Sequence, residues 1–266
     1  MNKQEYLKEY KKQEDKICIA QILDKIENSQ KENKMTYTDF LDMYQISLVS
    51  NFLKKISFKE YILVGGYKEA ERKCLIIYPS KEEENAKKLE KEILKIVRIN
   101  LYDEDIGKYT HRNYLGGIVK LGLKREKVGD ILVRKEGADI ICLESFAEIL
   151  KQELSTLTRF EKSKIEIKEM NEIIVPIVQK EEIKIIIPSF RLDNFVSDLA
   201  RTSRSKAVEI IKQERVFING QNETKVSKQV KEGDIITIRG KGRFVVKQLS
   251  GTTRSGRTVV IIEKYV

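Results

Sequence analysis

The sequence lacks the features of a membrane-spanning or secreted protein. Its 266 residues contain no run of about eighteen apolar residues, so we expect no membrane-spanning helix and no membrane contact. The first residues, MNKQEYLKEYKKQEDK, are polar and of mixed charge, without the apolar segment of a secretion signal. We therefore expect a cytoplasmic protein.

Cysteine and histidine are too sparse to predict a metal centre. The three cysteines, Cys18, Cys74 and Cys142, lie far apart and among apolar residues, which is typical of buried free thiols. The single histidine, His111, cannot complete a metal site with cysteines at these spacings. The sequence therefore predicts no metal ligands and no cofactor.

Positive charge is present in excess, and it is concentrated near the C-terminal end. The chain holds 51 Lys and Arg against 41 Asp and Glu, a net charge of +10. Residues 188–266 hold 16 basic and 8 acidic residues, a net of +8, which leaves 35 and 33 for residues 1–187. This asymmetry favours a polyanionic partner for the last domain, whereas a basic surface that only maintains solubility is the competing interpretation.

Hydrophobic periodicity predicts an α+β protein with three parts. Residues 1–56 form a helical region, in which Thr38 would cap the second helix; residues 57–176 form a central α+β domain; and residues 183–266 form a third domain. In the central domain, strands and helices alternate in a way that resembles an RRM, although the aromatic RNP signature is absent. The strands predicted there are Tyr61–Val64, Cys74–Tyr78, Val97–Leu101, Asp130–Arg134, Asp139–Leu143 and Lys164–Lys168, and the helices are Glu83–Lys95, Thr110–Leu121 and Glu144–Leu154.

The third domain begins with a strand and two helices. Leu192, Phe195, Val196 and Leu199 have the spacing of one buried helix face, and Ser203 is a candidate N-cap for the helix that follows. The dipeptide Asn219-Gly220 then predicts a hairpin turn between short strands. We expect a strand over residues 258–265, preceded by a basic hairpin loop at Gly251–Gly256 that contacts RNA.

Hydroxyls and cations gather where the second of these helices begins. The free backbone N–H groups and positive dipole of a helix N-terminus suit a phosphate, as do two serines and two cations. The competing interpretation is that the serines only cap the helix and the cations are solvated. The assignment fails if Arg191, Arg204 and Lys206 point to different sides or form ion pairs with neighbouring acids. The predicted RNA-binding residues are Arg191, Ser203, Arg204, Ser205, Lys206, Lys212, Arg215, Lys225 and Lys228.

Four motifs in this region occur in a recognisable order. Arg-Leu-Asp, Ser-Arg-Ser-Lys-Ala, Val-Phe-Ile-Asn-Gly and Gly-Asp-Ile-Ile-Thr-Ile follow one another within about residues 183–245, and this order resembles the S4 RNA-binding domain. The resemblance implies that two helices face structured RNA and that a small β-sheet supports them.

A central motif extends the resemblance. Thr110–Leu123, THRNYLGGIVKLGL, runs into KREKVGDILV, and this stretch is similar to the signature of the YlmH family, as is Thr38–Asp42. The two glycines, Gly116 and Gly117, indicate that something packs closely against this helix. Lys124 and Arg125 precede a strand, and we expect them to make a second RNA contact.

The resemblance to the YlmH family covers the chain from about residue 36 to its end, and it implies a function. The family is linked to ribosome-associated quality control on large subunits that still hold peptidyl-tRNA, and some members were named for a cell-division gene neighbourhood. The expected partners are therefore rRNA, tRNA and the large ribosomal subunit, while the sequence identifies no protein partner.

We expect the protein not to be an enzyme. His111 has no positioned partner that would make it a general base. Neither Gly65-Gly66 nor Gly116-Gly117 forms the Gly-x-Gly loop of a cofactor site, and no nucleotide-binding motif of a tyrosyl-tRNA synthetase is present. The alternatives left open are an RNA-modifying enzyme, of the pseudouridine synthase or methyltransferase type, and a scaffold protein linked to cell division.

Overall fold

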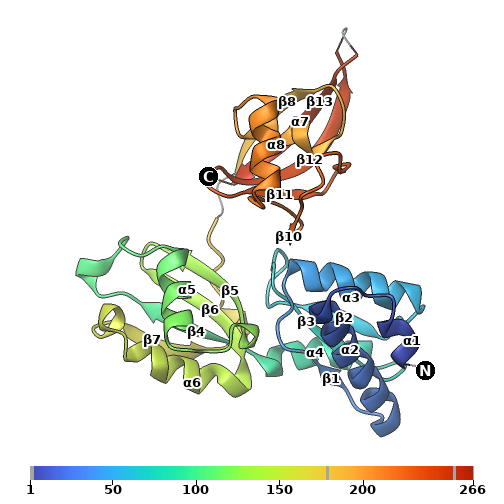
Figure 1. The fold of residues 1–266 in the computed structure, drawn as a ribbon. Coiled ribbons are helices and arrows are strands. Elements are labelled where there is room, and N and C mark those ends of the chain that lie inside the picture. Colours follow the sequence, from blue (N-terminus) through green and yellow to red (C-terminus); the bar gives the residue numbers. More distant parts are fainter. Residues whose placement is uncertain (1–2, 178–179, 254–255, 266) are drawn as a thin grey trace. The chain divides into compact units, whose positions relative to one another are not determined.

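The computed structural model describes residues 3–177, 180–253 and 256–265. It divides into two compact units, residues 1–176 and 177–266, which are described separately (Figure 1). The second unit includes residues 183–266, the range expected for the S4 domain. Among the described residues, no helix is both long and apolar enough to cross a membrane.

The first unit opens with helices that pack on a small sheet. Helices α1 (Lys3–Leu7), α2 (Gln13–Glu32) and α3 (Met43–Lys55) lie beside the sheet β1-β3-β2, formed by Thr36–Tyr37, Cys74–Ile77 and Tyr61–Val64. Helix α3 begins after Asp42, which forms a capping box with Gln45, so the cap lies four residues beyond Thr38, where we had expected it. Leu75 and Ile77 of β3 share one buried cluster with residues of α2 and α3. The division expected at residue 57 therefore passes through a continuous core.

The second part of this unit is a four-stranded antiparallel sheet. Its elements follow one another as β4 (Leu94–Asn100), α5 (His111–Lys120), β5 (Val128–Arg134), β6 (Gly137–Leu143), α6 (Glu144–Ser155) and β7 (Lys164–Lys168). The strand order is β5-β6-β4-β7, and α5 and α6 pack on one face (Figure 1). This is the βαββαβ arrangement of ferredoxin-like and RRM folds, so the expected α+β class and the RRM-like topology are confirmed.

The opposite face of this sheet is buried at its central strands, β4 and β6. Ile96 and Ile141 pack there against Cys74 and Ile76 of β3, in a buried cluster that also contains residues of α4 (Glu83–Ile93). All seven residues of β6 are buried. Because an RRM stacks bases on these central strands, RNA cannot stack there in this domain.

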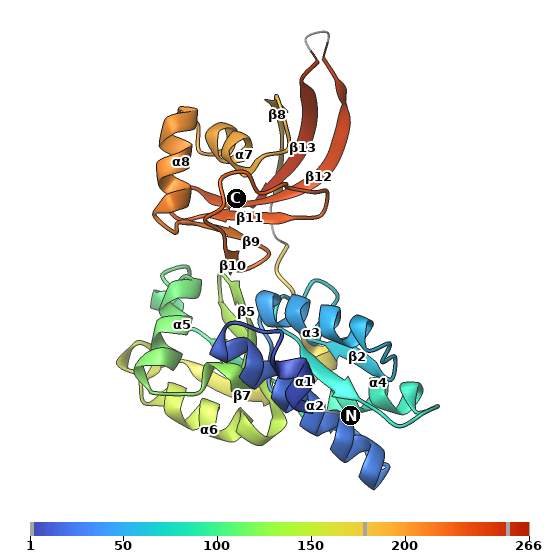
Figure 2. The ribbon, with the colours of Figure 1, turned by 45° about the vertical axis from the view of Figure 1, so that its right-hand side comes forward.

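The second unit builds two helices on one sheet. Helices α7 (Leu192–Leu199) and α8 (Arg204–Lys212) pack on the strand order β10-β9-β11-β12-β13-β8 (Figure 2). Asn219 and Gly220 have φ angles of 50° and 80° and form the expected turn between β9 and β10. The strands are β8 (Lys180–Ile187), β9 (Val216–Ile218), β10 (Gln221–Asn222), β11 (Ile235–Ile238), β12 (Gly242–Thr252) and β13 (Thr258–Tyr265).

The sheet is larger than the small sheet expected, because β12 and β13 extend as a two-stranded ribbon past the other strands (Figure 2). The ribbon includes part of the predicted basic loop Gly251–Gly256. Arg254 and Ser255 of that loop lie outside the described residues.

Candidate nucleic-acid interface

A buried carboxylate joins the two helices of the second unit. Asp193 lies in the first turn of α7, and its side chain is 2% exposed. It accepts hydrogen bonds at 3.1 Å from Nε and Nη2 of Arg191, just before α7. It also accepts one at 2.9 Å from Nε of Arg204, the first residue of α8. Asp193 therefore brings together two predicted RNA-binding arginines that lie thirteen positions apart in the sequence.

The two guanidinium groups keep this carboxyl ionised. Burial raises the pKa of Asp193, but the hydrogen bonds from Arg191 and Arg204 outweigh that effect and hold the pKa below its ordinary value. One negative charge then faces two positive charges, so the cluster retains a net charge of +1. Arg204 remains 58% exposed and can present its outer N–H groups to a further anion.

These contacts go against the simplest form of the predicted site. Arg191 and Arg204 are paired with Asp193, and Nζ of Lys206 lies 2.7 Å from Oε2 of Glu209. All three cations therefore form the ion pairs with neighbouring acids that the sequence-based prediction named as the outcome against it, and the site in its predicted form, with these cations free for phosphate, is not what the structure shows. The pair between Lys206 and Glu209 is more than half exposed on both sides, so it contributes little stability and can be exchanged for a phosphate contact.

Ser203 caps a helix, as the competing interpretation had it. Its Oγ accepts a hydrogen bond from the backbone N–H of Lys206 at 3.3 Å and lies 3.0 Å from Oγ of Ser205. The Ser203 hydroxyl is therefore occupied by the first turn of α8.

A basic pocket lies in the same unit. It has a volume of about 270 Å³, and its lining includes five cationic side chains and no acidic one. Among the described residues, no acid pairs with Arg201, Arg215, Arg239 or Lys241. Lys206 and Arg215 were predicted RNA-binding residues, whereas the other three were not. The cationic residues of the pocket are Arg201, Lys206, Arg215, Arg239 and Lys241.

Backbone pairing fixes two arginines of this pocket. Nη2 of Arg215 donates to the carbonyl of Arg239 at 3.0 Å, and the backbone N–H of Arg239 donates to the carbonyl of Arg215 at 2.9 Å. The Arg239 guanidinium lies 4.8 Å from the centre of the Phe217 ring, a cation–π distance. Since these residues meet only through the pairing of β9 with β11, sequence spacing gave no signal for the pocket.

The remaining predicted cations of this unit lie outside the pocket. Lys212, Lys225 and Lys228 are exposed. The carbonyl of Lys228 accepts a hydrogen bond from the backbone N–H of Leu192 at 2.8 Å, which ties its loop to the start of α7. The side chains of Lys225 and Lys228 are therefore carried on a loop that is fixed next to Arg191.

The expected second contact at Lys124 and Arg125 is only partly available. Arg125 turns inward, and its Nη1 donates to the carbonyls of Val128 and Gly129. Burial, followed by the positive charge of Arg72, lowers the pKa of Arg125 to about 10. Arg125 thus has a structural role, and Lys124 alone remains exposed.

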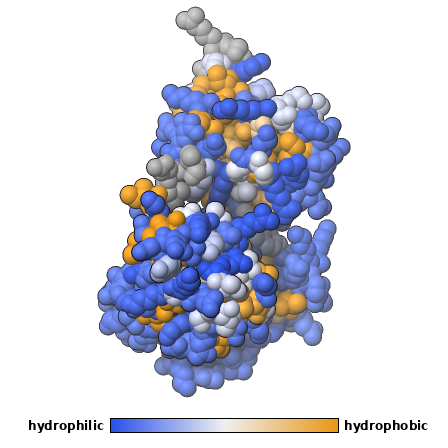
Figure 3. Space-filling view, turned by 90° about the vertical axis from the view of Figure 1, so that its left-hand side faces the viewer, coloured by the Kyte–Doolittle hydropathy of each residue, from blue (hydrophilic) through white to orange (hydrophobic). Residues whose placement is uncertain are grey.

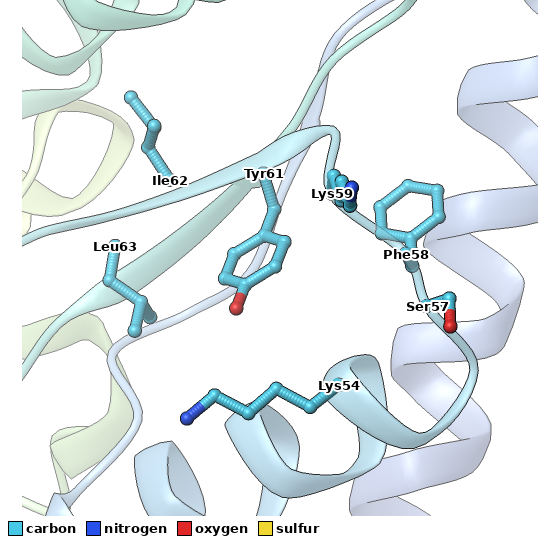
Figure 4. Close-up of a pocket in the computed structure, with 7 residues that line it drawn as sticks. All are labelled: Lys54, Ser57, Phe58, Lys59, Tyr61, Ile62 and Leu63. Atoms are coloured by element: carbon cyan, nitrogen blue, oxygen red, sulfur yellow. The ribbon is translucent and has the colours of Figure 1, made fainter.

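A separate hollow of the first unit differs in character from the basic pocket. It measures about 640 Å³ and lies between the end of α3 and the edge strand β2. Figure 4 shows Tyr61 pointing from β2 toward the helix end that carries Lys54, with Phe58 and Leu63 also in the lining. Apolar and aromatic groups dominate this hollow, so we do not count it in the nucleic-acid interface.

One face of the molecule is mainly hydrophilic. Figure 3 shows one face of the molecule, on which apolar residues form separate groups among polar ones. Recognition by charge at defined positions fits such a surface better than a broad apolar contact.

Two helices on a sheet with a convergent basic pocket define an S4-type RNA-binding protein, and the family model "S4 domain" matches residues 190–236. Two further models, "YlmH, N-terminal" and "Putative RNA-binding domain in YlmH", match residues 14–82 and 90–172. The chain belongs to the YlmH family. The first of these models spans the residue at which the sequence analysis had divided the N-terminal region from the central domain.

Known proteins include a relative of nearly the same length. The chain is 27% identical over 255 residues to "Ribosome-associated protein quality control protein P2" of Bacillus subtilis (strain 168), covering 95% of this chain and 96% of that protein. A solved structure, "Cell division protein ylmH from Streptococcus pneumoniae", is 20% identical with a TM-score of 0.43. That match covers 62% of this chain and 98% of the other.

Proposed function

We propose that the protein is a non-catalytic RNA-binding factor that acts in the cytoplasm, on the large ribosomal subunit, in ribosome-associated quality control. Its RNA targets would be rRNA and tRNA. Support comes from the name of the Bacillus subtilis relative, which matches this chain over nearly its whole length.

One structural observation carries the proposal. Five cationic side chains line the pocket of the S4 domain, and no acid lies among its lining residues. A pocket of this composition attracts anions, and the planar guanidinium of arginine offers several N–H donors in a geometry that suits phosphate oxygens. The phosphate backbone of RNA is a ligand that matches this charge.

The salt dependence of binding tests the proposal. Association with purified large ribosomal subunits should weaken steeply as salt rises, because phosphate contacts release counterions. The double variant Arg201→Gln/Lys241→Gln should lower the slope of log affinity against log salt by about 2, since each phosphate contact contributes about 1.

A matched control removes the same charge elsewhere. Lys88→Gln/Lys91→Gln alters two exposed lysines of α4 and should leave the slope near that of the unchanged protein. A salt-insensitive association, as a protein-interaction scaffold would show, would overturn the proposal.

The absence of catalysis has its own test. Large-subunit rRNA and tRNA incubated with the protein and with S-adenosylmethionine should show no new modified nucleoside when their nucleosides are separated by chromatography before mass spectrometry, because pseudouridine has the same mass as uridine. A stoichiometric new methyl group or pseudouridine would establish an RNA-modifying enzyme instead.

A further inference from the structure

Two adjacent glycines of α5 have different surroundings. A Cβ atom added to Gly117 would lie 2.8 Å from Cδ1 of Leu157, so close packing accounts for that glycine. A Cβ atom added to Gly116 would meet nothing within 4 Å. Glycine is the least favourable residue in a helix interior after proline, and no contact within the described structure compensates for it at Gly116.

Cations flank the open glycine on the same face of the helix. Arg112 and Lys120 lie four residues before and four residues after Gly116, a spacing that places all three on one face. Both cations are exposed, and among the described residues neither forms an ion pair. Val119, next to them, is 61% exposed, and α5 contains no acidic residue.

This face has the chemistry of a surface for a nucleic-acid backbone. With no side chain at Gly116, a sugar and its phosphate can approach the helix closely, while Arg112 and Lys120 meet the phosphates on either side. Val119 offers an apolar contact to a sugar. The central strands that stack bases in an RRM are buried in this domain, so an RNA contact of this domain would use another surface.

From these observations we infer that Arg112, Gly116, Val119 and Lys120 form a second RNA-binding surface, on the outer face of α5. The inference rests on the proposed function, because it assumes an RNA target, and it assigns to the central domain a contact separate from the S4 pocket. We call these four residues the α5 face.

The experiment uses the full chain with two probes, purified large ribosomal subunits and protein-free large-subunit rRNA. Gly116→Gln fills the open space with a polar residue that favours helix. It should keep or raise the temperature of unfolding and weaken binding to both probes several-fold. Arg112→Gln/Lys120→Gln should lower the salt slope by about 2, whereas Lys88→Gln/Lys91→Gln should not.

The outcomes separate the two proposals. If the α5-face variants bind like the control while Arg201→Gln/Lys241→Gln weakens binding, the inference is wrong and the proposed function stands. If the α5-face variants weaken binding to subunits but not to protein-free rRNA, the face contacts a ribosomal protein, and the inference is again overturned. If no variant of either surface changes the salt slope, the proposed function fails.

Discussion

At the residue scale, one buried acid connects the strands of the central sheet. Asp139 on β6 has a fully buried side chain and accepts hydrogen bonds from Arg98 at 2.8 and 2.7 Å and from Arg134 at 3.0 Å. The backbone N–H of Ile174 donates a further bond at 3.0 Å. Burial raises the pKa of Asp139, but these hydrogen bonds and positive charges outweigh it and hold the pKa below the ordinary value of 3.8.

Asp139→Asn should therefore destabilise the first unit strongly. The substitution leaves two largely buried arginines without an acid, and breaking a buried ion pair costs about 3–5 kcal/mol. Because the folded-state pKa is lowered, the charge stabilises the fold above about pH 4, and this contribution is lost as pH falls through the folded-state value. Urea unfolding at pH 7 should show the full difference between the two proteins, and the difference should shrink below pH 4. An equal difference at both pH values would contradict this account.

At the element scale, Gly137 allows the β5–β6 hairpin to pair with β4. Its φ angle is 151°, and a Cβ atom there would lie 1.8 Å from the carbonyl oxygen of Ile99. Backbone cannot move aside as a flexible side chain can. The hairpin therefore depends on glycine at this position for reasons internal to the fold.

Alanine substitutions should have opposite effects on stability at this glycine and at Gly116 of α5. Gly137→Ala should destabilise the protein by about 1–3 kcal/mol, the cost of a strained backbone conformation. Gly116→Ala should stabilise it by up to about 1 kcal/mol, because alanine favours the helical conformation more than glycine does and its Cβ atom would displace no neighbouring atom. Denaturant unfolding midpoints measure both changes, and a loss of stability in Gly116→Ala would show that this glycine has a packing role after all.

At the scale of the whole molecule, the second unit has a core of its own. Its buried cluster runs from Ile185 to Ile262 and contains no residue of the first unit. Residues 177–266 expressed alone should therefore unfold in a single cooperative transition, as calorimetry would show. This fragment should bind large subunits with a smaller salt slope than the full chain. A fragment without an unfolding transition would contradict independent folding. A fragment with the same salt slope as the full chain would contradict a contribution of the first unit to binding.

Features that depend on neighbouring residues in the sequence could be predicted, whereas features that depend on tertiary contacts could not. The strands Tyr61–Val64 and Lys164–Lys168 were predicted with the bounds that the structure shows, because hydrophobic alternation and turn residues are local properties. The pairing of Asp193 with Arg191 and Arg204 and the basic pocket with Arg201 and Arg239 depend on tertiary contacts. The burial of Arg125 was missed for the same reason, since a cation before a strand looks exposed until the carbonyls around it are known.

The strand order of the second unit has a consequence for folding and self-association. β8, its first strand, pairs with β13, its last, so partners such as Ile187 and Thr258 are 71 positions apart, and Lys180 and Tyr265 are 85 apart. Closing so long a loop costs chain entropy, so we expect the pairing of β13 with β8 to form slowly. A chain that stops before Thr258 would give β12 an open edge and would leave β8, already the last strand of the sheet, without its partner, so that each could pair with a strand of another molecule. Proteolytic loss of residues 258–266 should consequently make the domain aggregate, as light scattering would show.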